Sequence, residues 1–253
     1  MKDILAFTFF FFLCAGAWPG QAFADDLETM VVATDFPPYS IVDKPGSSSG
    51  IGVEIMQEIA KRLSLSVRRV QLPASQIDTM SKNELAIFVA VTRTDARESR
   101  YRWVGKLTDD HYCLAMQKSG KSVSTIESAR ELKAIGVNQS SGTEAAMDRL
   151  GLKNKSLAAN NSGNVKKLFA GRIDAWFAPA SIVSDSIRRE KLDPEKIQCL
   201  GDFGKSSYWI AASPKIDNAL YEKLKATFSL IEKEGLLDSI FARNGLPDQR
   251  ARP

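Results

Sequence analysis

Two arginines in one short polar segment are the side chains best suited to hold a ligand. Residues 92–97 read TRTDAR and place Arg93 and Arg97 beside the hydroxyl of Thr92. A guanidinium offers a planar fork of N–H donors that matches two carboxylate oxygens and stays charged. Alternatively, either arginine pairs with nearby acids such as Asp95 or Glu98, and such exposed pairs are common and weak. The segment indicates recognition of a carboxylate, with surface ion pairing as the competing interpretation.

A second segment offers backbone donors. Residues 140–143 read SSGT and lie directly before a predicted helix at 144–150. A helix N-terminus has unsatisfied N–H groups and a positive dipole end, and Gly142 allows close backbone approach. We expect Ser141, Gly142 and Thr143 to meet an anion, although a hydroxyl in this loop also suits an ordinary helix cap.

Aromatic rings follow the first predicted strand. Residues 35–39 read DFPPY, and the two prolines exclude a continued strand and stiffen the loop. Phe36 and Tyr39 are therefore candidates for rigid faces against a ligand. Packing of both rings against the neighbouring helix is the alternative.

Other chemistries lack their parts. His111 is the single histidine, so neither a metal site nor a histidine-based triad is expected, and no nucleotide-binding glycine loop occurs. The net charge of +4 is mild and no basic tract carries interleaved aromatics, which argues against nucleic acid as a partner. We expect no cofactor and no catalytic residue.

Strands and helices alternate along the chain. The pattern predicts an α/β fold with parallel strands, in which residues 44–50 form a flexible Gly/Ser-rich loop. Helices are predicted at 51–63, 144–150, 162–169 with Ser162 as the cap, 181–190, 217–231 and 233–242, and strands at 29–34, 66–71, 85–91, 132–137, 173–178, 197–200 and 208–212. Two α/β halves without a linker suggest lobes joined by strands crossing near 111–116 and 202–210.

The first residues read as an export signal. Lys2 precedes an apolar run at 4–13, and Ala22 and Ala24 are the small residues that a signal peptidase reads. The run is shorter than the roughly 20 residues of a membrane span, which argues against an uncleaved anchor. We expect cleavage after Ala24, leaving 253 − 24 = 229 residues in the periplasm.

Two cysteines remain after the predicted cleavage. Cys113 and Cys199 form an even pair in an oxidising compartment, so a disulfide between them is the favoured interpretation. Two separate buried thiols are the alternative, since sequence does not fix the Cα distance that a bridge needs.

Several segments together resemble the bacterial extracellular solute-binding proteins of family 3, the amino-acid-binding receptors of ABC importers. They occur in family order and span almost the whole predicted mature chain. The segments are residues 33–40, 52–56, 92–97, 101–105, 132–137, 141–144 and 170–177.

The resemblance implies a two-lobed periplasmic binding protein fold of type II, with mostly parallel sheets and two crossover strands at the hinge. Lobe one would comprise 25–113 plus 208–253, and lobe two 114–207. It also implies that Arg97 grips a ligand carboxylate, that Thr92 adds a hydrogen bond and that an aromatic of the 35–39 loop forms a wall. A monomer that serves an inner-membrane ABC permease follows.

One position departs from the family pattern. Amino-acid-binding members carry an acid shortly after the Asp-Ala strand, where it pairs with the α-ammonium, and Pro179 stands at or near that position. An ammonium buried without an anion is costly. A standard α-amino acid would need Asp35, Glu54 or Asp185 to reach the site, and a carboxylate without the amine fits as well.

The sequence favours a periplasmic binding protein for a small polar solute, an amino acid or related organic acid. One alternative is an accessory or sensor protein whose ligand occupancy signals to a partner. The other is an enzyme on the same scaffold, such as a dehydratase acting on a cyclic carboxylate, which would need a positioned acid or base in the cleft.

Overall fold

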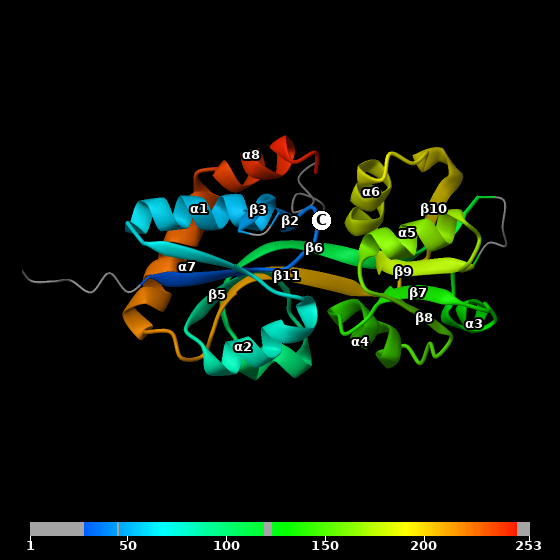
Figure 1. Cartoon of the computed structure of the whole chain (residues 1–253), viewed down its shortest axis with the longest axis horizontal. Helices are drawn as coiled ribbons and strands as arrows, with labels where there is room; N and C mark the ends of the chain where they lie inside the picture. Colours follow the sequence, from blue (N-terminus) through cyan, green and yellow to red (C-terminus); the bar gives the residue numbers. More distant parts are fainter. Residues whose placement is uncertain (1–27, 45, 119–122, 247–253) are drawn as a thin grey trace, which may run out of the picture.

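The computed structural model of the chain describes residues 28–44, 46–118 and 123–246. The predicted export signal at 1–24 lies outside these residues. Within them, nine strands form one continuous sheet in the order β4-β1-β5-β11-β6-β9-β7-β8, with β10 paired to β6. Figure 1 shows two groups of helices at opposite ends of this sheet, joined by the long strands β6 and β11. The α/β, two-lobed prediction is confirmed.

The first half contains a parallel three-stranded unit covered by helices on both faces. Strand β1 pairs in parallel with β4 and with β5, as expected for strands connected by helices. Its elements are β1 (Thr29–Ala33), β2 (Ile41–Lys44), β3 (Ser47–Ser49), α1 (Ile51–Leu63), β4 (Val67–Gln71), η1 (Ala74–Gln76), α2 (Ile77–Asn83), β5 (Ala86–Thr92), η2 (Asp95–Arg100), α7 (Asn218–Lys233) and α8 (Leu236–Arg243).

The second half repeats the arrangement, with β7 parallel to both β8 and β9. Its elements are α3 (Ile126–Arg130), β7 (Ile135–Asn138), α4 (Gly142–Arg149), β8 (Lys155–Ala158), α5 (Asn161–Phe169), β9 (Ala175–Pro179), α6 (Ala180–Arg189), η3 (Pro194–Lys196) and β10 (Ile197–Leu200).

Two long strands connect the halves. Strand β6 (Arg102–Gln117) pairs with β11 (Lys205–Ala212) along residues 102–111, and then with β9 and β10 along residues 112–117. All of these pairings are antiparallel, whereas the outer pairings of each half are parallel. The lobe boundaries at 113/114 and 207/208 remain a prediction.

The apolar pattern explains the core of the first half. Strand β5 reads AIFVAVT and is buried on both faces, as a central parallel strand must be. On α1, Ile55 and Ile59 lie one turn apart and are fully buried against the sheet.

Two local predictions are wrong. Residues 44–50 are not a plain flexible loop, because β2 and β3 pair as an antiparallel hairpin there. Helix α5 is capped by Asn160, whose side chain accepts from the backbone N–H of Gly163, while Ser162 donates to Glu190. The asparagine two residues earlier therefore took the capping role predicted for Ser162.

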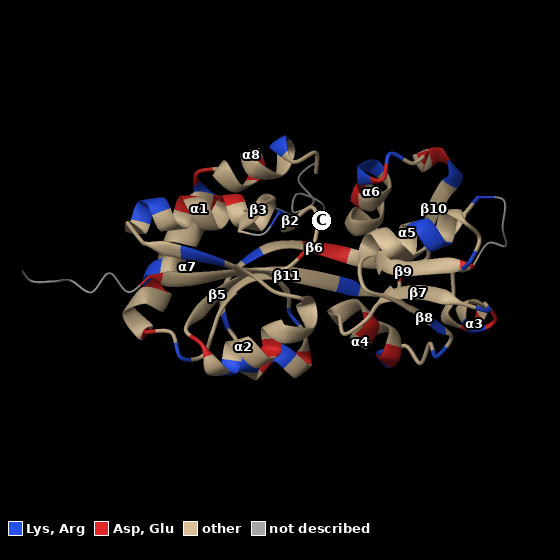
Figure 2. Cartoon of the chain, in the orientation of Figure 1, with Lys and Arg blue, Asp and Glu red and all other residues tan. Residues whose placement is uncertain are grey.

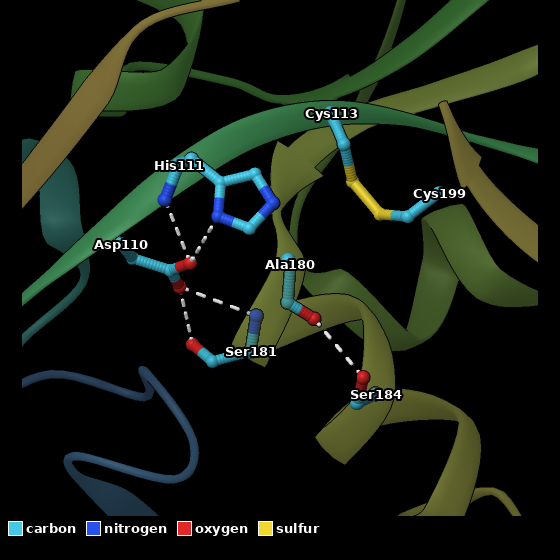
Figure 3. Close-up of a disulfide and its surroundings, with 7 residues drawn as sticks. All are labelled: Asp110, His111, Cys113, Ala180, Ser181, Ser184 and Cys199. Carbon is cyan, nitrogen blue, oxygen red and sulfur yellow. Dashed lines mark hydrogen bonds and ion pairs between the residues drawn. A yellow bond between two sulfur atoms is a disulfide. The ribbon is translucent and has the colours of Figure 1, made fainter. Parts of the chain in front are cut away.

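A disulfide joins Cys113 of β6 to Cys199 of β10 (Figure 3). Their Cα atoms lie 5.5 Å apart, within the usual range for a bridge. Because the bonded residues are 86 positions apart in sequence, the bridge links β6 covalently to a strand that lies far from it in the sequence.

Across the described ranges, no helix has the length and apolar character needed to cross a membrane.

Candidate functional site

A cavity of about 630 Å³ lies where six parallel strands end. Residues at or just after the carboxyl ends of β1, β4 and β5 line it from the first half, and those after β7, β8 and β9 line it from the second. Loops at this edge of parallel sheets expose backbone N–H groups and helix N-termini to a ligand. The two sets of parallel strands therefore create one site with a wall from each half.

Most of the predicted site residues meet at this cavity. Phe36, Thr92, Arg97, Ser141, Gly142 and Thr143 all line it.

Tyr39 does not line the cavity. It is fully buried, and its ring lies 5.8 Å from Phe36 and 4.7 Å from Tyr208. Phe36 also meets Tyr208 edge to face at 5.0 Å. Of the two aromatic residues in the loop, Phe36 thus presents a surface to the cavity, and Tyr39 supports it from behind.

Arg97 is held by an acid that the sequence analysis did not single out. Its Nε donates to Oδ1 of Asp78 at 3.0 Å and its Nη2 to Oδ2 at 3.3 Å, while Nη1 lies 3.4 Å from the carbonyl oxygen of Thr92. Asp78 also accepts from Tyr101 at 2.7 Å and pairs with Arg100 at 3.6 Å. These bonds use at most three of the five N–H donors of the guanidinium, leaving two for a ligand.

Arg93 pairs with a nearby acid, which is the alternative interpretation of its segment. It forms a bidentate ion pair with Glu98, and its guanidinium lies over the rings of Trp103 and Trp209, at 5.0 and 4.5 Å from their centroids. The pair holds the pKa of Glu98 below its usual value. Arg93 is absent from the cavity wall, so Arg97 is the arginine that faces it.

The start of α4 supports both interpretations of its loop. Ser141 accepts from the backbone N–H of Glu144 at 3.1 Å, as a helix cap does. Gly142, the first helical residue, packs directly against Thr92, and a Cβ at Gly142 would lie 3.0 Å from the Cβ of Thr92. The two halves thus touch across the cavity between two predicted site residues.

Backbone strain occurs on the cavity wall. Among the described residues other than glycine, Ala90 and Ser140 have positive φ of 57° and 55° without following the C-terminus of a helix, and both line the cavity. The other two, Ser64 and Lys191, follow helices, where a left-handed residue is ordinary. Strained conformations tend to persist where a site requires them.

The acids near the cavity are few. Asp35 lines it, and Val42 donates to one of its carboxylate oxygens at 3.4 Å. Glu54 instead pairs with Arg243 and Asn244, and Asp185 is buried beside Arg188. Pro179 is itself a lining residue. Of the three acids weighed for an ammonium, only Asp35 reaches the cavity wall.

A second polar cluster lies behind the site and was missed by sequence reasoning (Figure 3). The buried carboxylate of Asp110, on β6, accepts from Ser181 Oγ at 2.5 Å, from Ser181 N at 3.2 Å and from His111 N at 2.8 Å. Tyr39 contacts Ser181 Oγ at 3.1 Å. Because the single hydroxyl proton of Ser181 goes to Asp110, Tyr39 is the donor in that contact.

Burial raises the pKa of Asp110 above its usual value, against the hydrogen bonds from Ser181 and His111 that lower it. Figure 2 shows an acidic segment in the middle of β6, between the two halves. Sequence gave no signal for this cluster, because Asp110 and Ser181 are 71 residues apart.

In the view of Figure 2, basic and acidic residues alternate over α1, α2 and α6. Within the described part of the chain, no group of three or more His, Cys, Asp or Glu side chains could hold a metal ion.

Known proteins are similar to this chain in sequence or in fold. A protein of Neisseria gonorrhoeae named "Probable histidine-binding protein" is 23% identical over 214 residues, which are 83% of this chain and 79% of that protein. A histidine kinase sensor domain similar to periplasmic binding proteins superposes with a TM-score of 0.77 at 18% identity, covering 87% of this chain and 96% of that one.

An ancestral arginine-binding protein bound to arginine superposes with a TM-score of 0.74 at 18% identity, covering 85% of this chain and 96% of that chain. At these identities the two structures establish the fold alone. The model of one family, the bacterial extracellular solute-binding proteins of family 3, matches residues 29–246. The chain therefore belongs to the bacterial extracellular solute-binding proteins of family 3.

Proposed function

We propose that this protein captures a small carboxylate-bearing solute in the periplasm and delivers it to an inner-membrane ABC permease, without chemical turnover. The observation that carries the proposal is the position of Arg97. Its guanidinium lines a cavity at the carboxyl ends of six parallel strands and is oriented by Asp78. Family membership and the names of the relatives support an amino acid or related organic acid as the solute.

In this proposal each half supplies one part of the site. Arg97 and Thr92 bind the carboxylate from the first half, and the start of α4 at Ser141, Gly142 and Thr143 meets it from the second. Closure of the two lobes then buries the ligand, and the permease recognises the closed form. Selectivity arises because a ligand must satisfy both walls at once.

The proposal is tested first by calorimetry after a thermal-shift screen of amino acids, dicarboxylates and aromatic acids. A ligand that binds the folded state raises the melting temperature by mass action. We expect Arg97→Ala to weaken binding at least about tenfold, since a hydrogen bond to a charged group contributes about 1.5–3 kcal/mol. Arg100→Ala is the matched control, because Arg100 also pairs with Asp78 and does not line the cavity.

Closure is tested at Gly142. A methyl group there would press on Thr92 at 3.0 Å, so Gly142→Ala should hold the lobes apart and reduce ligand-induced compaction in small-angle X-ray scattering. Gly163→Ala is its control, because a methyl group at Gly163 meets its nearest atoms at an ordinary 3.5 Å. Equal compaction of both variants would count against closure at Gly142.

A sensor role is the second candidate, favoured by the similarity to a histidine kinase sensor domain. Transport by the permease in vesicles supplied with the loaded protein supports delivery, whereas a ligand-dependent complex with a kinase and no transport supports sensing. Recovery of an altered ligand after incubation would instead indicate an enzyme. A secreted form beginning at Asp25, monomeric by light scattering, is expected in either binding role.

A further inference from the structure

Three asparagines form a hydrogen-bonded chain that ends at the cavity. Asn164 of α5 donates from Nδ2 to Oδ1 of Asn138 at 2.8 Å, and Asn138 donates from Nδ2 to Oδ1 of Asn161 at 2.6 Å. Asn138 ends β7 and Asn161 begins α5, and both line the cavity. The amide oxygens of Asn138 and Asn161 each accept from the amide before them, so the chain has a direction that ends at Asn161.

Asn161 is left with an amide group that only donates. Its side-chain oxygen is engaged by Asn138, whereas its Nδ2 has no hydrogen-bond partner among the residues that the structure describes. The residue is 8% exposed and lines the cavity. An amide nitrogen on the wall of a cavity can donate to an acceptor that a ligand supplies there.

The direction of the chain follows from its buried end. In this direction, the side chain of Asn164 has only its amide oxygen without a hydrogen-bond partner, and that oxygen lies beside Gly136. Reversal of all three amides would leave two N–H donors without acceptors at that fully buried position. An unsatisfied carbonyl is more readily tolerated than an unsatisfied N–H, so the observed direction is favoured.

The rest of the second-half wall also donates. Helix α5 begins at Asn161, and its cap Asn160 accepts only the N–H of Gly163, so the positive end of the helix faces the same space. None of the described lining residues from 138 to 182 is acidic, and Pro179 is one of them. This wall therefore has donors for an oxygen acceptor and no anion for an ammonium.

We infer that Asn161 and the start of α5 form a second subsite, which binds an oxygen acceptor of the ligand and disfavours a cationic nitrogen. The inference rests on the proposed function, because it concerns the part of the same ligand that Arg97 does not bind. The ligand class is a small acid with a carboxylate for Arg97 and a second carboxylate or carbonyl oxygen for Asn161. Glutarate and 2-oxoglutarate belong to this class, whereas L-glutamate and 5-aminopentanoate carry an ammonium.

Calorimetry with these four acids on the full mature chain tests the inference. We expect glutarate or 2-oxoglutarate to bind at least about tenfold more tightly than both ammonium-bearing acids. Tighter binding of L-glutamate or another α-amino acid would overturn the subsite and leave capture of a carboxylate intact. If none of the four acids binds while the thermal-shift screen finds another carboxylate ligand, the subsite fails and the proposed function stands; if the screen finds no carboxylate ligand, both fail.

Asn161→Asp isolates the donor. The aspartate keeps an oxygen for Asn138 and suits the first turn of a helix, so folding should be preserved. It replaces the free donor by a negative oxygen, and binding of glutarate and 2-oxoglutarate should fall at least about tenfold.

Asn160→Asp adds the same charge one residue away and keeps the cap, so it should have a much smaller effect. Equal losses in the two variants would attribute the effect to charge alone and overturn the role of Asn161. Unchanged affinity for oxygen-terminated acids in Asn161→Asp would overturn it as well.

Discussion

Asp78 and Asp110 belong to two separate polar clusters and satisfy their charge in different ways. Asp78 is 28% exposed at its side chain and is surrounded by Arg97, Arg100 and Tyr101. The side chain of Asp110 is fully buried, and its closest partners are the neutral donors of Ser181 and the backbone of His111.

The difference separates two tasks. Asp78 lies within one half and fixes the position of Arg97, which lines the cavity. Asp110 connects the crossing strand β6 to α6, and through Ser181 to Tyr39 in the first half. We therefore expect the partly exposed cluster around Asp78 to serve ligand recognition, and the buried cluster around Asp110 to set the relative position of the two halves.

Removal of the buried carboxylate should produce the largest effect. Asp110→Ala leaves the N–H and hydroxyl of Ser181 without their acceptor, and each unsatisfied buried group costs about 1–3 kcal/mol. We expect a loss of about 3 kcal/mol in the free energy of unfolding, measured by chemical denaturation. The charge lost from the interior offsets part of the cost.

Asp109→Ala is the control for that variant. Asp109 is the preceding residue, but its side chain is 48% exposed and pairs with Lys106 at the surface. Exposed pairs contribute about 0–1 kcal/mol, so this change should be near neutral. Similar losses in both variants would remove the distinction between the buried and the exposed acid.

These contacts also show which features of the structure could be predicted from the sequence and which could not. Apolar strands such as β5 and the polar loops after them were sufficient to predict the α/β sheet and the edge at which Thr92, Arg97 and Ser141 meet. Periodicity and propensity are local signals, and they identify these elements because each one is built from neighbouring residues.

Partners that lie far apart in the sequence could not be predicted in this way. Asp78 lies 19 residues from Arg97, and Ser181 lies 142 residues from Tyr39. Tyr39 is predicted to line the cavity because its loop does, yet the ring is buried and its hydroxyl donates to Ser181. Only the packing of the two halves decides which of two loop aromatics faces the ligand.

Asp78→Asn should produce an intermediate loss of stability, and it should also weaken ligand binding. The amide keeps the shape but loses the charge that orients Arg97, at a partly exposed site where screening reduces the gain. We expect a stability loss of about 1–1.5 kcal/mol together with weaker carboxylate binding. Asp95→Asn, an exposed change on η2, is the control and should alter neither.

If Asp78→Asn changed stability without changing affinity, Asp78 would be a structural residue and the assignment to recognition would be wrong. Calorimetry with the ligand identified by the screen distinguishes the two outcomes. The variant Asp110→Asn should show the reverse pattern, with the larger change in stability.

Tyr39→Phe should have a smaller effect. The change removes the hydroxyl that donates to Ser181 and retains the ring that supports Phe36. A net hydrogen bond contributes about 0.5–1.5 kcal/mol, so we expect a loss of about 1 kcal/mol in unfolding experiments. An increase in the fraction of open molecules in scattering would support a role of this contact in holding the two halves together, and an unchanged fraction would contradict it.

The smallest effect concerns pH. The folded state raises the pKa of Asp110 above its ordinary 3.8, so the folded protein holds this proton at pH values where the unfolded chain has released it. Stability from this group is therefore present at low pH and declines as pH rises from about 3.8 through the folded pKa. Glu98, Glu190 and Glu234, whose pKa values are lowered, give the opposite slope below pH 4.5.

Because those glutamates are common to both proteins, subtraction of the Asp110→Asn curve from the wild-type curve isolates Asp110. We expect the difference in unfolding free energy to fall by under about 1 kcal/mol per pH unit in that window, less than the 1.4 kcal/mol that one fully titrating proton gives. A difference that instead rises with pH would mean that the donors of Ser181 and His111 outweigh burial. Burial would then not be the dominant influence on Asp110, and its assignment as a carboxylate that the interior disfavours would fail.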